Sequence, residues 1–457
     1  MPSFEPSDPR PVHFVGVAGA GMSALAELLA RRGVRVTGCD ANAAAVGDLE
    51  ALGIEVTTGH DPAHATGASA LVVTSAMPRD HPELARAREL NIPVIRRAEA
   101  LAEAVSVGRV VGIAGTHGKT TTTVMTTEAL AAAGQDPTGI VGGRVGEWGG
   151  NLRLGSDRLF VVEADEYDRS FLALSPTVAV VTNMEADHLD IYQDLADIRG
   201  AFAEYLRPAS TVVLCADDAG ARSLSLSSAA EVIRYGIESG DARLLARDIR
   251  SRNGGSTFVA EYDGEPVTEV LLRVPGRHNV LNALAALGSG LALGASAAEM
   301  AKGLASFRGV ERRFQRIGER GGVLVIDDYA HHPTEIVATL DAARAAFPGR
   351  RLLAAFQPHL YSRTRDFAAE FGRALAKSDQ VFLTEIYPAR ERPLPGVTAS
   401  LIERPLRDAG GRLAWRGERS DLAASLAAAV RPGDVVLTIG AGDITRTGPE
   451  LLSRLAE

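Results

Sequence analysis

The chain has 457 residues, of which 46% are apolar and 23% charged, and its formal net charge is −9. This length exceeds one ordinary hydrophobic core, so we expect about two to four domains, and the composition is typical of globular proteins. The acidic balance disfavours general nucleic-acid binding, which needs a basic surface, but it leaves a local basic pocket for a small anion open.

No apolar run reaches the roughly 18–20 residues that a membrane-spanning helix needs, and the first ten residues lack the features of a signal peptide. The two cysteines, Cys39 and Cys215, are too few for a disulfide framework or a four-cysteine zinc site. We therefore expect a cytoplasmic protein that binds neither nucleic acid nor membranes.

Strand-like runs rich in β-branched residues alternate with Ala- and Leu-rich helical stretches, which predicts an α/β protein built on mainly parallel sheets. Three domains are expected, over residues 1–108, 109–315 and 316–457. The predicted strands are 12–15, 34–37, 71–74, 109–114, 159–162, 178–181, 323–326, 352–355 and 435–439. Helices are expected from about Ser23 to Arg32 and near 279–292, with a small antiparallel sheet around 241–275.

The first domain opens with a glycine cluster between a strand and a helix. The run from Val15 to Met22 is close to a dinucleotide-binding fingerprint, and Asp40 ends the next strand. The middle glycine of that fingerprint is replaced by Ala18, and the same turn can cradle the diphosphate of another ligand. The residues predicted to bind this ligand are Gly19, Ala20, Gly21, Met22, Ser23 and Asp40.

A second glycine-rich turn follows the strand 109–114 and precedes a Thr-rich helix. Such a turn exposes backbone N–H groups and directs the positive end of a helix at an anion. Lys119 can reach the terminal phosphates of a nucleotide, and the Thr120 hydroxyl can bind Mg²⁺. Ile113 stands where the strict P-loop pattern has glycine, so the match is to a shorter variant. The predicted ATP-binding residues here are Gly115, Thr116, His117, Gly118, Lys119, Thr120 and Thr121.

Acidic residues follow the strand 159–162. Glu163 is the first of them and our first choice for a Mg²⁺ ligand, because an acid at the end of a buried strand can meet the metal at the phosphate loop. Asp165, Glu166 and Asp168 are equally compatible with a solvated loop. His188 lies in an acidic turn after the next strand, where it can bind a second metal ion, contact a substrate carboxylate, or do neither.

Several separated motifs together resemble the Mur ligases, the enzymes that add amino acids to the peptidoglycan precursor. The resemblance runs nearly end to end and rests on motifs in the family's order. They are Gly115–Thr120, Glu163–Glu166, Thr182-Asn183 with Asp187-His188, Pro275–Asn279 with Asn282-Ala283, Arg312–Phe314, Asp327–Glu335 and Phe356–His359.

The resemblance implies three domains: a Rossmann-like N-terminal domain for the UDP-sugar, a central P-loop ATPase-type domain, and a Rossmann-like C-terminal domain that closes over the site with the amino acid. It implies ATP and Mg²⁺ as cofactors, with Glu163 and His188 as ligands of the second Mg²⁺. His278 and Asn279 resemble ATP contacts, and Arg313 and Asp328 resemble nucleotide-side residues. His331 and Arg363, with Lys119, resemble the catalytic residues.

Most family members carry a modified lysine after the metal-binding histidine, whereas residues 200–203 here read Gly-Ala-Phe-Ala. The branch that joins L-alanine to UDP-N-acetylmuramic acid also lacks this lysine, so these two substrates are the ones implied. Two further departures are Ala330 in place of a usual glycine and Leu360 in place of a frequent arginine. The oligomeric state is left open between monomer and homodimer.

Three alternatives remain. A related ligase joins a recycled tripeptide to the same sugar and differs in its acceptor pocket. An NAD-dependent oxidoreductase would account for the first domain but not for Lys119, Glu163 or the third domain. A P-loop switch or motor protein would leave the first domain and the His331-His332 pair unexplained.

Overall fold

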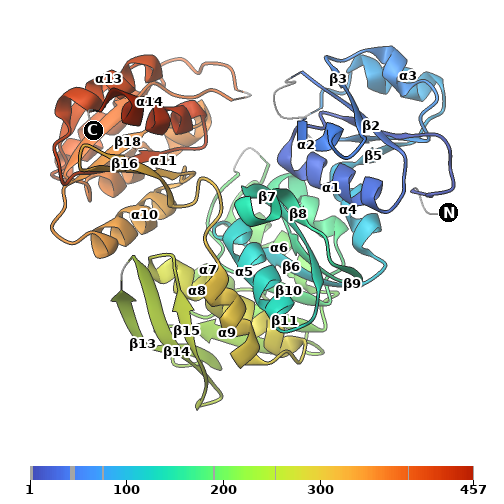
Figure 1. Ribbon diagram of the computed structural model, residues 1–457, viewed down its shortest axis with the longest axis horizontal. Helices are drawn as coiled ribbons and strands as arrows, with labels where there is room; N and C mark the ends of the chain where they lie inside the picture. Colours follow the sequence, from blue (N-terminus) through green and yellow to red (C-terminus); the bar gives the residue numbers. More distant parts are fainter. Residues whose placement is uncertain are drawn as a thin grey trace. The chain divides into compact units, whose positions relative to one another are not determined.

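The computed structural model describes residues 4–41, 47–74, 77–188, 191–252, 254–389 and 391–455. They form three sheets with flanking helices, as the predicted α/β class requires (Figure 1). The chain divides into two compact units. The first takes in most of the chain up to Phe307, and the second holds the residues from Arg308 onward together with residues 248–258 and 271–280. No helix within the described ranges is long and apolar enough to cross a membrane.

The N-terminal sheet is parallel throughout, with strands in the order β3-β2-β1-β4-β5. This is the strand order of Rossmann-like folds, whose ligands bind at the carboxyl ends of the strands. Its strands are β1 (Val12–Val15), β2 (Val36–Asp40), β3 (Glu55–Thr58), β4 (Ala70–Val73) and β5 (Val94–Arg96). Its helices are α1 (Ala20–Arg31), α2 (Gly47–Glu50), η2 (Pro62–Ala65), α3 (Pro82–Glu89) and α4 (Arg97–Val105).

The boundary between α1 and β2 differs from the prediction. Val34 was expected in the strand, but its N–H bonds to the carbonyl of Leu29, and Gly33 has a φ of +84°. This bond and the left-handed glycine form a Schellman motif, which ends the helix. Val34 is part of this motif and is therefore not part of the next strand. The strand therefore begins at Val36 and carries Asp40 as its last residue.

The central sheet runs in the order β15-β14-β13-β12-β11-β10-β6-β9-β7-β8. Its strands are β6 (Arg109–Ala114), β7 (Pro137–Val145), β8 (Gly150–Arg153), β9 (Ser156–Glu163), β10 (Val178–Val181), β11 (Thr211–Cys215), β12 (Glu231–Gly236), β13 (Leu244–Arg252), β14 (Gly255–Tyr262) and β15 (Glu265–Leu272). The helical segments are α5 (Lys119–Ala132), η3 (Gly146–Trp148), η4 (Tyr167–Ala173), α6 (Leu195–Leu206), α7 (Ala219–Arg222), α8 (Arg277–Ala292) and α9 (Ala297–Ser306). Strands β9 and β10 flank β6 on either side, so their carboxyl ends lie beside the loop that follows β6.

The turn-rich region after residue 241 adds strands to the central sheet rather than forming a separate one, because β13 pairs with β12. The last two strands are joined by Asp263 and Gly264, which have φ angles of +51° and +86°. Two residues with positive φ form the type I′ turn that closes an antiparallel hairpin. The expected antiparallel strands therefore extend the edge of the central sheet.

The C-terminal sheet has the order β16-β17-β21-β18-β19-β20, and only β16 runs antiparallel to its neighbour among the pairings described. Its strands are β16 (Gln315–Arg320), β17 (Val323–Asp328), β18 (Leu352–Phe356), β19 (Gln380–Thr384), β20 (Leu413–Gly417) and β21 (Val435–Ile439). The helical segments are α10 (Pro333–Ala346), α11 (Tyr361–Leu375), η5 (Ala399–Ile402), α12 (Glu403–Asp408), α13 (Arg419–Ala429), η6 (Asp443–Arg446) and α14 (Thr447–Arg454).

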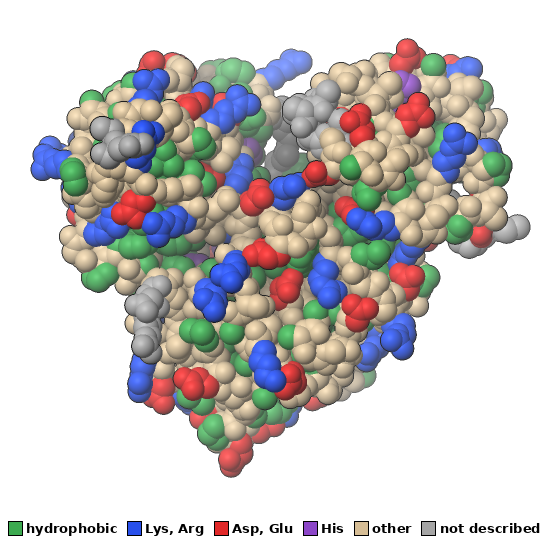
Figure 2. All heavy atoms as spheres, in the orientation of Figure 1, with side chains coloured by type: hydrophobic (Ala, Val, Ile, Leu, Met, Phe, Trp, Pro, Cys, Tyr) green, Lys and Arg blue, Asp and Glu red, His purple; other side chains and the backbone are tan. Residues whose placement is uncertain are grey.

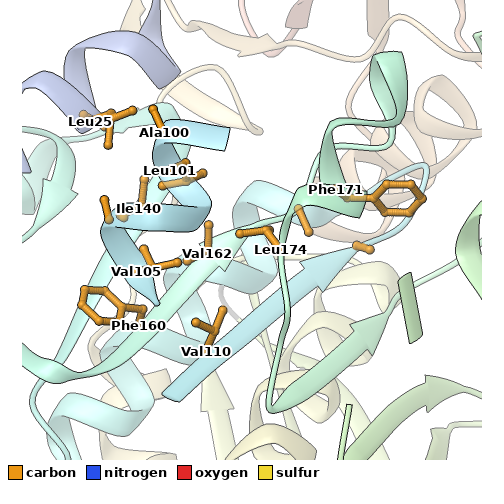
Figure 3. Close-up of a cluster of buried hydrophobic side chains, with 14 of the residues drawn as sticks. Leu25, Ala100, Leu101, Val105, Val110, Ile140, Phe160, Val162, Phe171 and Leu174 are labelled. Carbon is orange, nitrogen blue, oxygen red and sulfur yellow. The ribbon is translucent and has the colours of Figure 1, made fainter. Parts of the chain in front are cut away.

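A continuous apolar core joins the N-terminal sheet to the beginning of the central one. Leu25 of α1 and Leu101 of α4 lie in one buried cluster with Ile140 of β7 and Phe160 of β9 (Figure 3). Because apolar burial is the main stabilising term in folding, this shared core accounts for the grouping of both sheets in one compact unit. The predicted boundary between residues 108 and 109 stays a prediction.

On the face shown in Figure 2, acidic and basic side chains are interspersed.

Candidate active site

The second glycine-rich turn, residues 115–118, connects β6 to α5, and it is called the phosphate loop here after its predicted ligand. Its shape depends on two glycines. Gly115 has a φ of +138° and Gly118 a φ of +80°, both in the region that favours glycine. A Cβ on Gly115 would collide with Thr182 Oγ1, and one on Gly118 would lie 2.8 Å from Asn282 Oδ1. The loop therefore passes so close to its neighbours that these two positions accept no side chain.

The residues after β10 hold the loop from behind. The Thr182 hydroxyl and the Asn183 amide donate to the carbonyl of His117, at 2.6 and 3.1 Å, and Asn183 Oδ1 accepts from the His117 N–H at 2.8 Å. The Glu185 N–H donates to Thr116 Oγ1 at 2.9 Å. These bonds explain the Thr182-Asn183 motif, which was noted in the sequence without a role.

Lys119 begins α5, and its ammonium is held within the loop. Nζ donates to the carbonyl of Gly115 at 2.7 Å and to Glu166 Oε2 and Oε1 at 2.7 and 2.9 Å. Burial lowers the pKa of Lys119, but the carboxylate of Glu166 outweighs it and raises that pKa above its ordinary value. The lysine is therefore a fixed cation at the N-terminus of α5, a position that favours an anion such as phosphate.

Glu163 and Thr120 lie together, as the sequence predicted for a metal site. The Thr120 hydroxyl donates to Glu163 Oε1 at 3.0 Å, and the Gly142 N–H of β7 donates to Oε2 at 2.7 Å. A hydroxyl and a carboxylate oxygen beside a phosphate loop are the hard donors that Mg²⁺ prefers. The donor set thus fits Mg²⁺, with Thr120 and Glu163 as the residues that would hold it.

His188 adopts a φ of +54°, an unusual backbone conformation for a residue with a side chain. Its Nε2 lies 3.6 Å from Glu166 Oε1 and 3.8 Å from Asp187 Oδ2. Burial lowers the pKa of His188, but Glu166 and Asp187 more than offset this and raise it. Glu166 therefore contacts both Lys119 and His188, a central position that its sequence context did not predict.

The N-terminal glycine turn lies at the carboxyl end of β1 and leads into α1. The Ala18 N–H donates to Asp40 Oδ2 at 3.0 Å, so Asp40 holds the turn in place. The Ser23 hydroxyl donates to the carbonyl of Ala20 at 3.0 Å. Gly19, Gly21 and Met22 belong to the same turn and the first turn of α1, where the N–H groups of Met22 and Ser23 donate to the Gly19 carbonyl. The N-terminal end of a helix favours an anion.

Arg97, at the start of α4, is a basic residue beside this turn that the sequence reading missed. A Cβ on Gly21 would lie 3.0 Å from Arg97 Nη1, so the guanidinium packs directly against the glycine. Arg97 also lines a pocket of about 110 Å³ together with Arg96 and Arg169. The acids Glu99 and Asp168 line the same pocket, so its lining is mixed in charge.

In the second unit, Asp328 ends β17 and is buried. Its two carboxylate oxygens accept N–H bonds from Phe314 and Ala330, each at 2.8 Å. Burial raises the pKa of Asp328 to about 6, against the opposing effect of Arg313. Arg313 lies over the ring of Tyr329, 5.0 Å from its centroid, and 3.6 Å from Glu335 Oε1. Asp328, Arg313 and Glu335 therefore form one charged group.

The double histidine has two different roles. His332 is the N-cap of α10: its Nδ1 accepts from the Thr334 N–H, and Glu335 bonds back to the N–H of His332 at 3.2 Å. His332 and Glu335 therefore have a structural role, because this capping box satisfies backbone N–H groups at the start of α10. His331 Nδ1 lies 3.0 Å from the Tyr329 carbonyl and 3.4 Å from Glu335 Oε2. Capping therefore accounts for His332, but it does not account for the imidazole of His331.

The other predicted residues of this unit lie on α8 and α11. Asn279 is buried and donates to the carbonyl of Pro275 at 2.7 Å, while burial lowers the pKa of His278 to about 4, so its imidazole is neutral. Arg363 is 7% exposed in the first turn of α11. Ala330, where the family usually has glycine, has no positive φ and so tolerates its methyl group.

Three family models match the chain in consecutive order. They are "Mur ligase family, catalytic domain" over residues 11–109, "Mur ligase middle domain" over 113–290, and "Mur ligase, glutamate ligase domain" over 312–442. The chain belongs to the Mur ligase family.

Named Mur ligases resemble the chain over nearly its whole length. A UDP-N-acetylmuramate–L-alanine ligase of Acidothermus cellulolyticus is 47% identical and covers 97% of this chain and 94% of its own. The solved UDP-N-acetylmuramate–alanine ligase of Thermotoga maritima is 30% identical, with a TM-score of 0.83, over 97% of this chain and 99% of its own. A UDP-N-acetylmuramate:L-alanyl-γ-D-glutamyl-meso-diaminopimelate ligase from Neisseria meningitides is 30% identical, with a TM-score of 0.61, over 66% of this chain and 99% of its own.

Within this Mur ligase, Glu166, Thr182, Asn183 and Arg97 are the site residues that sequence reasoning missed or left undecided. Glu166 and Asp165 are both acids in the same short run, and no local signal separates the buried one from the other. Arg97 lies far from the glycine turn in sequence, so only the fold brings the two together.

Proposed function

We propose that the chain joins L-alanine to the carboxylate of UDP-N-acetylmuramic acid, with ATP converted to ADP and phosphate, in the synthesis of peptidoglycan precursors. The observation that carries this proposal is the phosphate loop with its buried Lys119–Glu166 pair and adjoining Thr120–Glu163 pair, in a chain 47% identical to a ligase of that name. The two free, buried cysteines suit a reducing compartment, and we infer that the reaction takes place in the cytoplasm.

A carboxylate and an amine do not condense in water, so ATP must first convert the carboxylate to an acyl phosphate. The attack of a carboxylate on the γ-phosphate brings two anions together, and catalysis consists mainly of neutralising their charge. Lys119 supplies a fixed positive charge at the loop, and Arg313 is our candidate for a second cation. Mg²⁺, held by Thr120 and Glu163 with His188 as a proposed further ligand, supplies charge neutralisation at the phosphates when bound.

The second step needs a neutral amine. The amino group of L-alanine attacks the acyl carbon, phosphate leaves, and a proton must be accepted from the nitrogen. We propose His331 for that role or for positioning the amine, because capping explains its neighbour His332 but not its own imidazole. Arg363 is the proposed partner of the acyl group.

For the sugar nucleotide we propose the glycine turn of the first unit. The N-terminus of α1 favours the diphosphate, and Arg97, packed on Gly21, adds a cation at the same turn. Asp40 contributes by holding Ala18, since its carboxylate accepts the Ala18 N–H.

The second candidate is the ligase that adds a tripeptide to the same sugar. It is favoured by the 30% identity to the Neisseria enzyme, but that match covers 66% of this chain, against 97% for the alanine ligase of Acidothermus. The two reactions share the acyl phosphate and differ only in the amine.

One assay separates the candidates. The protein is incubated with ATP, Mg²⁺ and UDP-N-acetylmuramic acid, and phosphate release and product mass are followed with single amino acids or with the tripeptide. We expect fast release and a new amide only with L-alanine. Faster turnover with the tripeptide would assign the chain to the recycling reaction, and phosphate release without any amide product would exclude a ligase.

A further inference from the structure

A second cluster of chemistry-bearing side chains lies in the N-terminal sheet, in residues that the proposed reaction does not use. His13 comes from β1, Cys39 from β2, His64 from η2 and Glu83 from the first turn of α3. One ligand atom from each of the four lies within 4.8 Å of all the others. Four elements that are distant in sequence therefore bring two imidazoles, one thiol and one carboxylate close together.

The separations between these atoms are short. Cys39 Sγ lies 3.2 Å from Glu83 Oε1, His64 Nδ1 lies 3.3 Å from the same oxygen, and His13 Nε2 lies 3.7 Å from Oε2. Around a tetrahedral zinc ion with bonds of about 2.0–2.3 Å, neighbouring ligand atoms are about 3.3–3.8 Å apart. The three separations from the Glu83 carboxylate are close to these values, and all four donor atoms lie within 4.8 Å of one another.

Burial sets this cluster apart from a surface group of acids and histidines. Cys39 and Glu83 are fully buried and His13 is 3% exposed. His13 Nε2 is buried without a hydrogen-bond partner, because Glu83 is beyond hydrogen-bond distance, whereas its Nδ1 is fixed by the Thr37 hydroxyl at 2.9 Å. A buried nitrogen without a partner costs about 1–3 kcal/mol, and a metal ion at the centre would be its partner.

The surroundings orient these groups as outer-shell residues orient metal ligands. Thr37 holds His13 by Nδ1 and leaves Nε2 directed inward, and the Asp61 N–H donates to Glu83 Oε1 at 3.1 Å. His60 Nδ1 lies 3.3 Å from Cys39 Sγ, beside the four donors. In protein metal sites, hydrogen bonds from neighbouring residues commonly orient the histidine and carboxylate ligands in this way.

We propose that His13, Cys39, His64 and Glu83 form a binding site for one zinc-type divalent cation. A thiolate with imidazoles and a carboxylate is a mixed, borderline-soft donor set, which selects zinc over Mg²⁺. Binding forms a metal–sulfur bond and releases the thiol proton of Cys39 to solvent. The site differs in donors and position in the chain from the Mg²⁺ site at Thr120 and Glu163.

The fold also connects this site to the glycine turn. The carbonyl of Cys39 accepts the N–H groups of Gly16 and Val17, at 2.8 and 3.1 Å, and the next residue, Asp40, accepts that of Ala18. A cation bound to Cys39 would therefore hold the end of β2 on which the turn rests.

Cobalt tests the site because a cobalt–thiolate bond absorbs in the near ultraviolet and tetrahedral Co²⁺ has intense visible bands. The full-length protein is stripped with a chelator and titrated with CoCl₂ alone, without nucleotide. We expect both absorptions to saturate at one equivalent and to disappear on addition of ZnCl₂. Absence of the thiolate band, or a band that grows only with large excess of cobalt, would overturn the proposal.

Matched variants identify the ligands. Cys39→Ser should abolish the thiolate band, whereas Cys215→Ser, at the other buried free cysteine, should keep it. His64→Gln should weaken cobalt binding more than about tenfold, since even an outer-shell partner is worth that much. His188→Ala, at the proposed Mg²⁺ site, should leave the thiolate band unchanged. Circular dichroism confirms that each variant folds, and a band that survives in folded Cys39→Ser or is lost in folded Cys215→Ser contradicts the site.

Discussion

Lys119 Nζ and Glu166 Oε2 lie 2.7 Å apart, with the lysine side chain 13% exposed and the glutamate 4% exposed. The cation expected to meet the phosphates is thus paired with a buried carboxylate of the same unit. A bound phosphate must share this ammonium with Glu166 or take it over, so the pair sets the charge that the nucleotide meets.

Glu166→Gln should destabilise the first unit. Removing one partner of a buried ion pair leaves an uncompensated charge, which costs about 3–5 kcal/mol. Trp148 lies in this unit and Trp415 in the other, so Trp148 fluorescence in a Trp415→Phe background follows its chemical unfolding. Addition of Mg·ATP should restore a large part of the loss, because phosphate then faces Lys119.

The control is Glu299→Gln, at the exposed Lys302–Glu299 pair of the same unit, where the side chains are 69% and 46% exposed. Exposed pairs contribute about 0–1 kcal/mol, so little should change. Equal effects of the two substitutions would show that the Lys119–Glu166 pair is not a buried charge pair in solution.

Lys119→Ala should abolish acyl-phosphate formation and leave binding of UDP-N-acetylmuramic acid within about twofold, because the sugar nucleotide is proposed to bind at the separate glycine turn. Positional isotope exchange within ATP, between the β–γ bridging oxygen and the β non-bridging oxygens in the presence of the sugar nucleotide, reports the first, and calorimetry the second. Weak sugar binding in this variant would mean that the assignment of the two loops is wrong.

Glu163→Gln should raise the Mg²⁺ concentration needed for half-maximal activity by at least about tenfold, since a direct ligand is worth more than an outer-shell partner. The measurement is phosphate release against Mg²⁺ at saturating ATP. Asp165→Asn is the matched control, because that carboxylate accepts the N–H of Tyr167 instead of facing Thr120. A larger shift for Asp165→Asn would move the metal site to that residue.

Asp328 should make the second unit less stable as the pH rises from about 4 to 6. Burial raises its folded pKa to about 6 from an ordinary value of 3.8. In this window the unfolded chain has lost the proton that the folded chain keeps, so the free energy of unfolding falls by up to about 3 kcal/mol and then stays level.

Asp328→Asn removes this titration. The variant should lose the fall between pH 4 and 6 even though it also disturbs the bonds to Phe314 and Ala330, whose loss does not depend on pH. Trp415, in β20 of the same sheet, reports the unfolding in a Trp148→Phe background. A stability difference between variant and parent that is constant across this range would contradict the raised pKa.

Much of the fold was predictable because regular burial dictates it. The buried apolar strands β1, β6, β10 and β21 have the predicted bounds, and the α/β class and the family are confirmed. The end of α1 was not predictable from apolar pattern alone, because a single backbone bond from Val34 decides it. The placement of β13 beside β12 depends on a pairing between strands, which no local signal encodes.

The candidate site shows the same division. Lys119, Thr120 and Glu163 follow directly from strand ends and a glycine turn, and the structure brings Thr120 and Glu163 into contact. The positions of Glu166 and Arg97 depend on tertiary packing, which the sequence does not show locally. The capping role of His332 was not predicted, because His332 stands beside His331 in a motif that indicates function. The catalytic and ligand-binding roles stay predictions.

The close fit of Gly115 and Gly118 against Thr182 and Asn282, with the hydrogen bonds from Thr182 and Asn183, restricts the shapes that the phosphate loop can adopt. Little conformational entropy is then lost on binding at this loop, and the adjustment falls on the side chain of Lys119. An inhibitor that mimics a phosphate group would match the loop as it stands. A compound that needs the loop to open would have to break its bonds to Thr182 and Asn183, and its affinity would fall accordingly.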